Sequence, residues 1–118
     1  MLTTKKIAAH VIRLVIDGEV KQTDIDQAAK TMEDSLKEEG KLRLLMEVKN
    51  LEGYDSIAAF IEDTQKTFQH YTDFEKIAIV TEEKWLKGVA SLGDLINPAN
   101  IKQFSLSERE LAEEWVEA

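Results

Sequence analysis

The stretch Phe74–Val80 reads FEKIAIV and ends in four consecutive apolar residues, Ile77-Ala78-Ile79-Val80. This run is too short and too apolar for anything but an interior strand, buried on both faces of a sheet. We therefore expect Phe74–Val80 at the centre of the sheet, and the other elements are assigned outward from it.

Three other segments are predicted as strands. Val11–Ile16 is rich in β-branched residues and stops at Asp17-Gly18, a pair typical of turns. Its apolar residues also fit helical spacing, but the β-branched run and the Asp-Gly stop favour a strand. Leu42–Val48 is typical of a mostly buried strand, and Ile101–Phe104 of a short edge strand.

The first predicted helix begins with a capping box formed by Thr23 and Asp26 and ends before Gly40. Its apolar residues recur at helical spacing and form one stripe that would face the sheet: Ile25, Ala28, Ala29, Met32 and Leu36.

Two more helices are predicted in the middle of the chain. Asp55 can cap a helix with apolar and aromatic residues at spacings of three and four, and Thr81 can cap another that begins with Glu82-Glu83. Acidic residues in the first turn favour a helix because they interact with its dipole.

The last predicted helix begins with a capping box formed by Ser107 and Glu110, with Leu106 and Leu111 as its hydrophobic staple. Leu111 and Trp115 lie four residues apart, so we expect both to anchor this helix on the sheet.

Strands and helices alternate along the whole chain without a linker or repeat. Such alternation predicts one α/β domain over residues 1–118, with a mixed, mostly parallel sheet of four to five strands and four helices.

Composition excludes several classes of function. The chain has 15 basic and 23 acidic residues, a net charge of -8, which disfavours nucleic acid as a partner. It has no cysteine, which is compatible with a reducing compartment, and we expect a cytoplasmic protein. The N-terminal residues 1–6 are polar, no export signal is evident, and no apolar run reaches the length of a membrane span.

Four parts of the chain together carry a family likeness. They are Leu14–Val20 followed by Thr23–Asp26, Leu42–Val48 leading to Gly53, Phe74–Val80 followed by Glu83-Lys84-Trp85-Leu86, and Ile101–Phe104 with Ala112 and Trp115. In order and spacing they resemble the SpoIIAA-like family of the STAS group, which is named for sulfate transporters and anti-sigma-factor antagonists. The resemblance covers nearly the whole chain. It implies a fold similar to that of known regulators and carries no established enzymatic activity. The family's fold is also likened to CRAL-TRIO lipid-transfer domains.

Ser56 is a candidate phosphorylation site because Asp55-Ser56 resembles the Asp-Ser pair of the antagonists. A helix N-terminus can stabilise a phosphate. However, Ile57-Ala58 replaces the antagonist pattern, and Asp55 and Glu52 would repel a phosphate. We predict that Asp55 caps a helix and that Ser56 is not a regulatory phosphosite.

No catalytic or metal-binding motif is found. His10 and His70 are the only histidines and have no ligand-type spacing around them, so no metal is predicted. Gly88–Gly93 lacks the Lys-Ser/Thr pair of a phosphate-binding loop, and Ser91 has no neighbouring base. The sequence predicts no cofactor and no enzyme.

Tyr54 and Trp85 are candidates for lining an apolar cleft. Both are placed near strand-to-helix junctions, where open α/β sheets tend to bind ligands. An aromatic residue at such a junction is more often a lid on the core.

Two functions follow as hypotheses. The first is a non-enzymatic regulatory or binding module that contacts a protein partner or small ligand. The alternative is a carrier of an apolar ligand or lipid. A homodimer is compatible with both.

Overall fold

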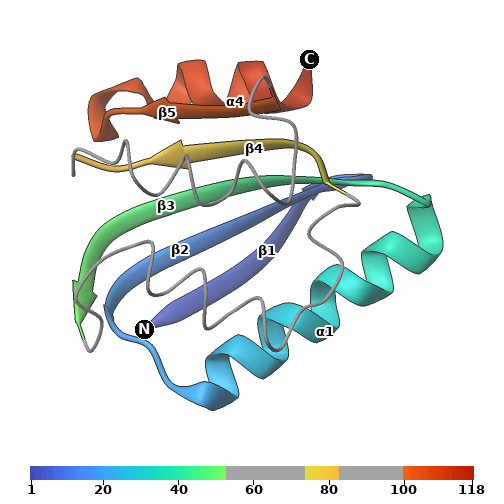
Figure 1. Ribbon diagram of the computed structural model, residues 1–118, viewed down its shortest axis with the longest axis horizontal. Coiled ribbons are helices and arrows are strands. Elements are labelled where there is room, and N and C mark those ends of the chain that lie inside the picture. The colour runs from blue at the N-terminus through green and yellow to red at the C-terminus, as the bar shows by residue number, and fades with distance from the viewer. Residues whose placement is uncertain (53–73, 83–99) are drawn as a thin grey trace.

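The computed structural model describes residues 1–52, 74–82 and 100–118 (Figure 1). Over these residues the chain forms the following elements: β1 (Leu2–Ala8), β2 (Val11–Glu19), α1 (Gln22–Glu39), β3 (Leu42–Glu52), β4 (Phe74–Val80), β5 (Ile101–Phe104), a 3₁₀ turn η3 (Leu106–Glu108) and α4 (Arg109–Glu117). The two helices predicted from Asp55 and Thr81 fall mainly outside the described residues, so two of the four predicted helices are confirmed.

The five strands form one sheet in the order β1-β2-β3-β4-β5 (Figure 1). β1 and β2 are antiparallel, and each of the other neighbouring pairs is parallel. The mixed, mostly parallel sheet and the edge position of β5 are therefore confirmed. The middle strand is β3, however, and not β4 as predicted, because the sequence did not reveal β1 at the opposite edge.

β1 was missed because its sequence, LTTKKIA, is mostly polar. An edge strand is solvated along one side, so it does not need the apolar run that marks an interior strand. Leu2 is buried, whereas Thr3, Lys5 and Lys6 are exposed.

β2 continues past the Asp17-Gly18 pair, where a turn was predicted. The pairing with β3 shifts register between Ile16 and Asp17, and Gly18 has a φ of 94°. Glycine adopts such a positive φ without steric cost, so the strand absorbs an irregularity there and ends at Glu19.

Side chains alternate between two cores, one on each face of the sheet. The core under α1 includes Ile12, Leu14, Ile16, Leu44, Met46, Ile77 and Ile79 together with the α1 stripe Ile25, Ala28, Ala29 and Met32. The core under α4 contains Val11, Leu45, Ala78, Val80, Phe104, Ala112 and Val116. This burial on both faces explains the continuous apolar runs in β3 and β4.

The N-terminus of α1 is capped differently from the prediction. The helix begins at Gln22, and the backbone N–H of Lys21 donates to a carboxylate oxygen of Asp24 at 3.1 Å. Asp26, predicted as the partner of Thr23, instead accepts a hydrogen bond from the Gln22 amide. The predicted end is confirmed: Gly40 has a φ of 73° and its N–H donates to the Leu36 carbonyl.

The start of α4 also differs from the prediction. Ser105, not Ser107, begins the turn, and its N–H and hydroxyl both donate to Glu108 Oε1, at 2.9 and 3.0 Å. Ser105 follows β5 directly in an extended conformation, so the chain turns into η3 two residues earlier than the predicted capping box.

α4 rests on the sheet through Ala112 and Val116, which are fully buried. Leu111 is 53% exposed, so its predicted roles as anchor and staple are wrong. The small Ala112 lets the helix approach the sheet, and larger side chains are left at its flank. Trp115 is half-buried there, with its ring 6.1 Å from that of Phe104 and 5.2 Å from the Lys76 ammonium.

These positions predict opposite results for two substitutions in α4. Val116→Ala removes buried methyl groups and is expected to lower the free energy of unfolding by about 2 kcal/mol. Leu111→Ala is expected to change it by less than about 0.5 kcal/mol. Urea denaturation of both variants measures these changes. A larger loss of unfolding free energy in Leu111→Ala than in Val116→Ala would contradict the packing of α4 through Val116.

The Ser105 hydrogen bonds lower the pKa of Glu108 below its ordinary value, the backbone bond contributing most, then the hydroxyl bond, with a smaller contribution from the positive charge of Lys102. Because the folded pKa is depressed, this interaction stabilises the fold above the unfolded glutamate pKa of about 4.3 and is lost as pH falls through the folded value.

Ser105→Ala is therefore expected to raise the pKa of Glu108 only part of the way, because the stronger backbone bond remains. NMR titration of the Glu108 carboxyl carbon measures this. Ser107→Ala is the control, since Ser107 contacts the Ser105 hydroxyl at 2.9 Å and, within the described residues, forms no hydrogen bond with Glu108. An unchanged pKa in Ser105→Ala would show that the hydroxyl does not contribute.

Candidate functional site

The residues singled out from the sequence lie mostly beyond what the structure describes. Tyr54, Ser56 and Trp85 fall outside the described residues, as does His70. The cleft at Tyr54 and Trp85 and the absence of phosphorylation at Ser56 therefore remain predictions.

His10 lies between β1 and β2. Its carbonyl accepts a hydrogen bond from the Arg43 N–H at 2.7 Å, and its buried ring Nε2 has no hydrogen-bond partner in the described part of the chain. Among residues 1–52, 74–82 and 100–118, no three histidine or acidic side chains are grouped so that they could hold a metal ion.

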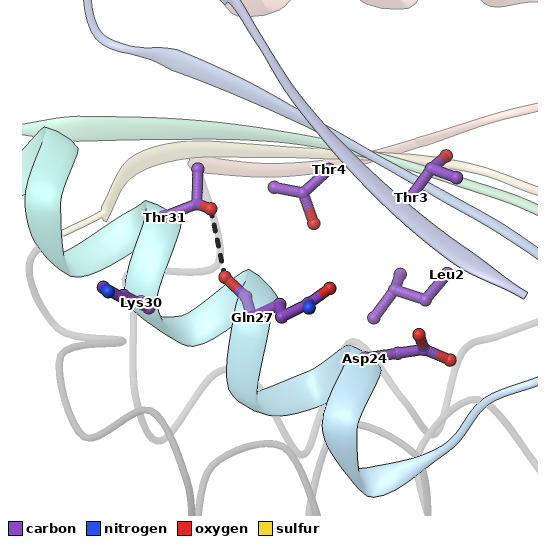
Figure 2. Close-up of a pocket in the computed structure, with 7 residues that line it drawn as sticks. All are labelled: Leu2, Thr3, Thr4, Asp24, Gln27, Lys30 and Thr31. Atoms are coloured by element: carbon purple, nitrogen blue, oxygen red, sulfur yellow. Dashed lines mark hydrogen bonds between the residues drawn. The ribbon is translucent and has the colours of Figure 1, made fainter.

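A surface groove of about 450 Å³ lies between β1 and α1 (Figure 2). Three of its lining residues come from β1 and four from α1: Leu2, Thr3, Thr4, Asp24, Gln27, Lys30 and Thr31. Figure 2 shows the side chains of Asp24 and Gln27 reaching from α1 toward β1. All but Leu2 are polar, so the groove is suited to a polar ligand or a peptide.

The local sequence explains why the groove is polar. In α1, Asp24, Gln27 and Thr31 are spaced by three and four residues and thus form a strip beside the buried stripe. In β1, Leu2 and Thr4 point to the same face of the sheet, which is the face covered by α1. Only the folded chain brings these two polar strips together.

Some polar groups in the groove already have hydrogen-bond partners, and others are available to a ligand. One carboxylate oxygen of Asp24 already accepts the Lys21 N–H, and the Thr31 hydroxyl donates to the Gln27 carbonyl at 3.0 Å. Within the described part of the chain, the Lys30 ammonium makes no ion pair and is exposed. The Gln27 amide and the Lys30 ammonium can therefore bind a ligand without breaking an existing contact.

A second polar cluster lies on the other face of the sheet, beneath α4. Glu47 of β3 is 1% exposed, and its Oε1 contacts Arg13 at 2.7 Å and Arg109 at 3.5 Å. Among the residues that the structure describes, its Oε2 and the Nε of Arg13 are buried without hydrogen-bond partners. Because Arg109 is the first residue of α4, the cluster ties the beginning of that helix to the sheet.

The C-terminal end of α4 is held by cations from two strands. Arg43 of β3 donates to the Val116 carbonyl at 2.9 Å, and Lys76 of β4 donates to the Trp115 carbonyl at 3.0 Å. Positive charges at this end of a helix interact favourably with its dipole. The polar side chains beneath α4 thus have a structural role, and the groove beside β1 is the better candidate for binding.

Sequence reasoning did not find the groove because neither half carries a recognisable motif. The available signals were the polar composition of LTTKKIA and the polar strip beside the α1 stripe. Each is common, and only their adjacency in the fold makes a site.

A family model described as SpoIIAA-like matches residues 11–117, nearly the whole chain. The chain belongs to the SpoIIAA-like family. The predicted family is thus confirmed. No curated protein matches the chain.

The fold of this SpoIIAA-like chain is similar to a crystal structure of an uncharacterised protein of the DUF3478 family from Shewanella loihica PV-4, described as having a SpoIIAA-like fold. The TM-score is 0.62 at 19% sequence identity, over 98% of this chain and 92% of the other. At that identity the likeness supports the fold alone. In the described part of the SpoIIAA-like chain, no helix is long and apolar enough to cross a membrane.

Proposed function

We propose that this SpoIIAA-like domain is a non-enzymatic regulatory module that acts by binding a protein partner in the cytoplasm. The observation that carries the proposal is the polar groove between an edge strand and a helix, whose walls carry hydrogen-bonding groups and the Lys30 ammonium, which has no ion pair among the described residues. Membership in the SpoIIAA-like family supports it.

The groove favours a protein over an apolar ligand. Six of its seven lining residues are polar, and a lipid chain would gain little by leaving water for such walls. Neither the comparisons nor the described residues support the lipid-carrier alternative.

Two experiments test the proposal, one for a protein partner and one for a bound lipid. Proximity labelling identifies candidate partners, and calorimetry with the purified candidates is expected to find one that binds with a dissociation constant below about 10 μM. That partner's activity is expected to change on binding. Native mass spectrometry of the chain purified from cells is the second experiment, and a lipid retained by most molecules would contradict the proposal. The failure of every candidate partner to bind would contradict it as well.

A further inference from the structure

We propose that β1 is the docking edge for an extended, acidic segment of the partner, which adds a strand to the sheet and lies along the groove. This inference rests on the proposed function and specifies how the partner is recognised. It follows from the hydrogen-bonding pattern of β1, the position of the groove and the charge of the strand.

Within residues 1–52, 74–82 and 100–118, the backbone of β1 pairs with β2 on one side only, and the groups on its other side can be assigned. Met1 and Asp17 exchange both of their backbone hydrogen bonds, at 2.7 and 2.8 Å. In an antiparallel pair, bonded and non-bonded residue pairs alternate. With the register Thr3↔Val15 and Lys5↔Arg13, these residues bond to β2, so Leu2, Thr4 and Lys6 direct their N–H and C=O groups away from the sheet.

Two of these three outward-facing residues also border the groove. Leu2 and Thr4 line it, and α1 forms its opposite wall with Gln27 and Lys30. A segment that bonds to the edge of β1 would therefore place alternate side chains between β1 and α1. Recognition of this kind takes affinity from backbone hydrogen bonds and selectivity from the adjoining groove.

Charge favours an acidic segment from another protein. β1 contains Lys5 and Lys6 and no acidic residue, in a chain whose net charge is -8. Lys6 is paired with Glu38 and Glu39, whereas Lys5 and Lys30 are exposed and make no ion pair within the described residues. Acidic side chains on an added strand would pair with these free cations. A second copy would bring the same lysines to this edge, and repulsion between them disfavours self-association there.

A synthetic peptide of seven residues, the length of β1, provides the probe: acetyl-Glu-Thr-Val-Glu-Val-Thr-Glu-amide. At about 1 mM peptide, NMR is expected to show shifts and slowed amide exchange at Thr4 and Lys6. A peptide with alternate backbone nitrogens methylated is the control and is expected to leave these signals unchanged. Absent shifts, or shifts confined to other elements, would overturn the proposal.

Two substitutions at one position separate the backbone from the side chain. Thr4→Pro removes an outward N–H and not a bond to β2, so the fold is expected to persist while peptide affinity falls by about tenfold or more. Thr4→Ala keeps the N–H and is expected to bind within about threefold of the unaltered chain. Lys30→Gln is expected to weaken binding of the acidic peptide by about threefold. It is expected to leave the binding of a peptide with glutamine in place of glutamate unchanged.

Failure of this inference is distinguishable from failure of the proposed function. A partner that binds Thr4→Pro as tightly as the unaltered chain would show that β1 is not the docking edge, while the regulatory role stands. If no partner binds the unaltered chain, the proposed function itself fails.

Discussion

Replacement of Glu47 by alanine is expected to lower the free energy of unfolding by about 3 kcal/mol. The carboxylate is 1% exposed and is the shared partner of Arg13 and Arg109. Without it, Arg13 is left partly buried with no counter-charge. The 30% exposure of the Arg13 side chain lets water compensate in part, so we expect the lower end of the range for a broken buried ion pair.

The unpaired charge of Arg13, and not the lost side-chain volume, is expected to cause most of this destabilisation. Glu47→Leu alone should therefore be destabilising, and adding Arg13→Met should recover most of the loss, because an apolar pair of similar size avoids the desolvation of two charges. Urea denaturation of the single and double variants measures the coupling. Additive losses would contradict an energetic link between the two residues.

Ile79→Ala is expected to have an effect at least as large, about 3–4 kcal/mol. Ile79 is fully buried on the α1 face of β4, and its neighbours in the sheet are Met46 of β3 and Gln103 of β5. Truncation removes buried methyl and methylene groups and leaves a cavity that the flanking strands prevent from closing.

Ile79→Val is the matched control and is expected to cost about 0.5–1.5 kcal/mol, because one methyl group is lost. Urea denaturation measures both losses. If the slope of the unfolding free energy against urea concentration is unchanged, both losses arise in the folded state. A loss below about 1 kcal/mol for Ile79→Ala would show that this core is loosely packed.

The predictable parts of the fold are those that bury apolar side chains at a regular period. The apolar runs in β2, β3 and β4 and the stripe in α1 are buried against the sheet, so the sequence reveals them. β1 forms backbone hydrogen bonds to β2 along one side and exposes two lysines. Its composition is therefore similar to that of a loop.

The caps were less predictable because capping residues are repeated nearby. Ser105 and Ser107 lie before Glu108 and Glu110 with identical spacing, and only the path of the chain out of β5 selects the first pair. Glu47 was not singled out either, since one acid within an apolar strand has no partner in its own segment. Its partners come from β2 and α4.

The candidate site was not predictable from local sequence for a related reason. The groove consists of ordinary polar residues from two elements, and its open backbone edge is a property of the sheet and not of any motif. Tyr54, Ser56 and Trp85 were selected from local pattern and family resemblance, and their roles remain predictions.

Amide hydrogen exchange along β1 tests most directly whether the sheet presents an open edge to a partner. The N–H groups of Thr3 and Lys5, which bond to β2, are expected to exchange about tenfold or more slowly than those of Thr4 and Lys6. Equal protection of all four would contradict the open edge, and equally fast exchange would contradict the pairing of β1 with β2.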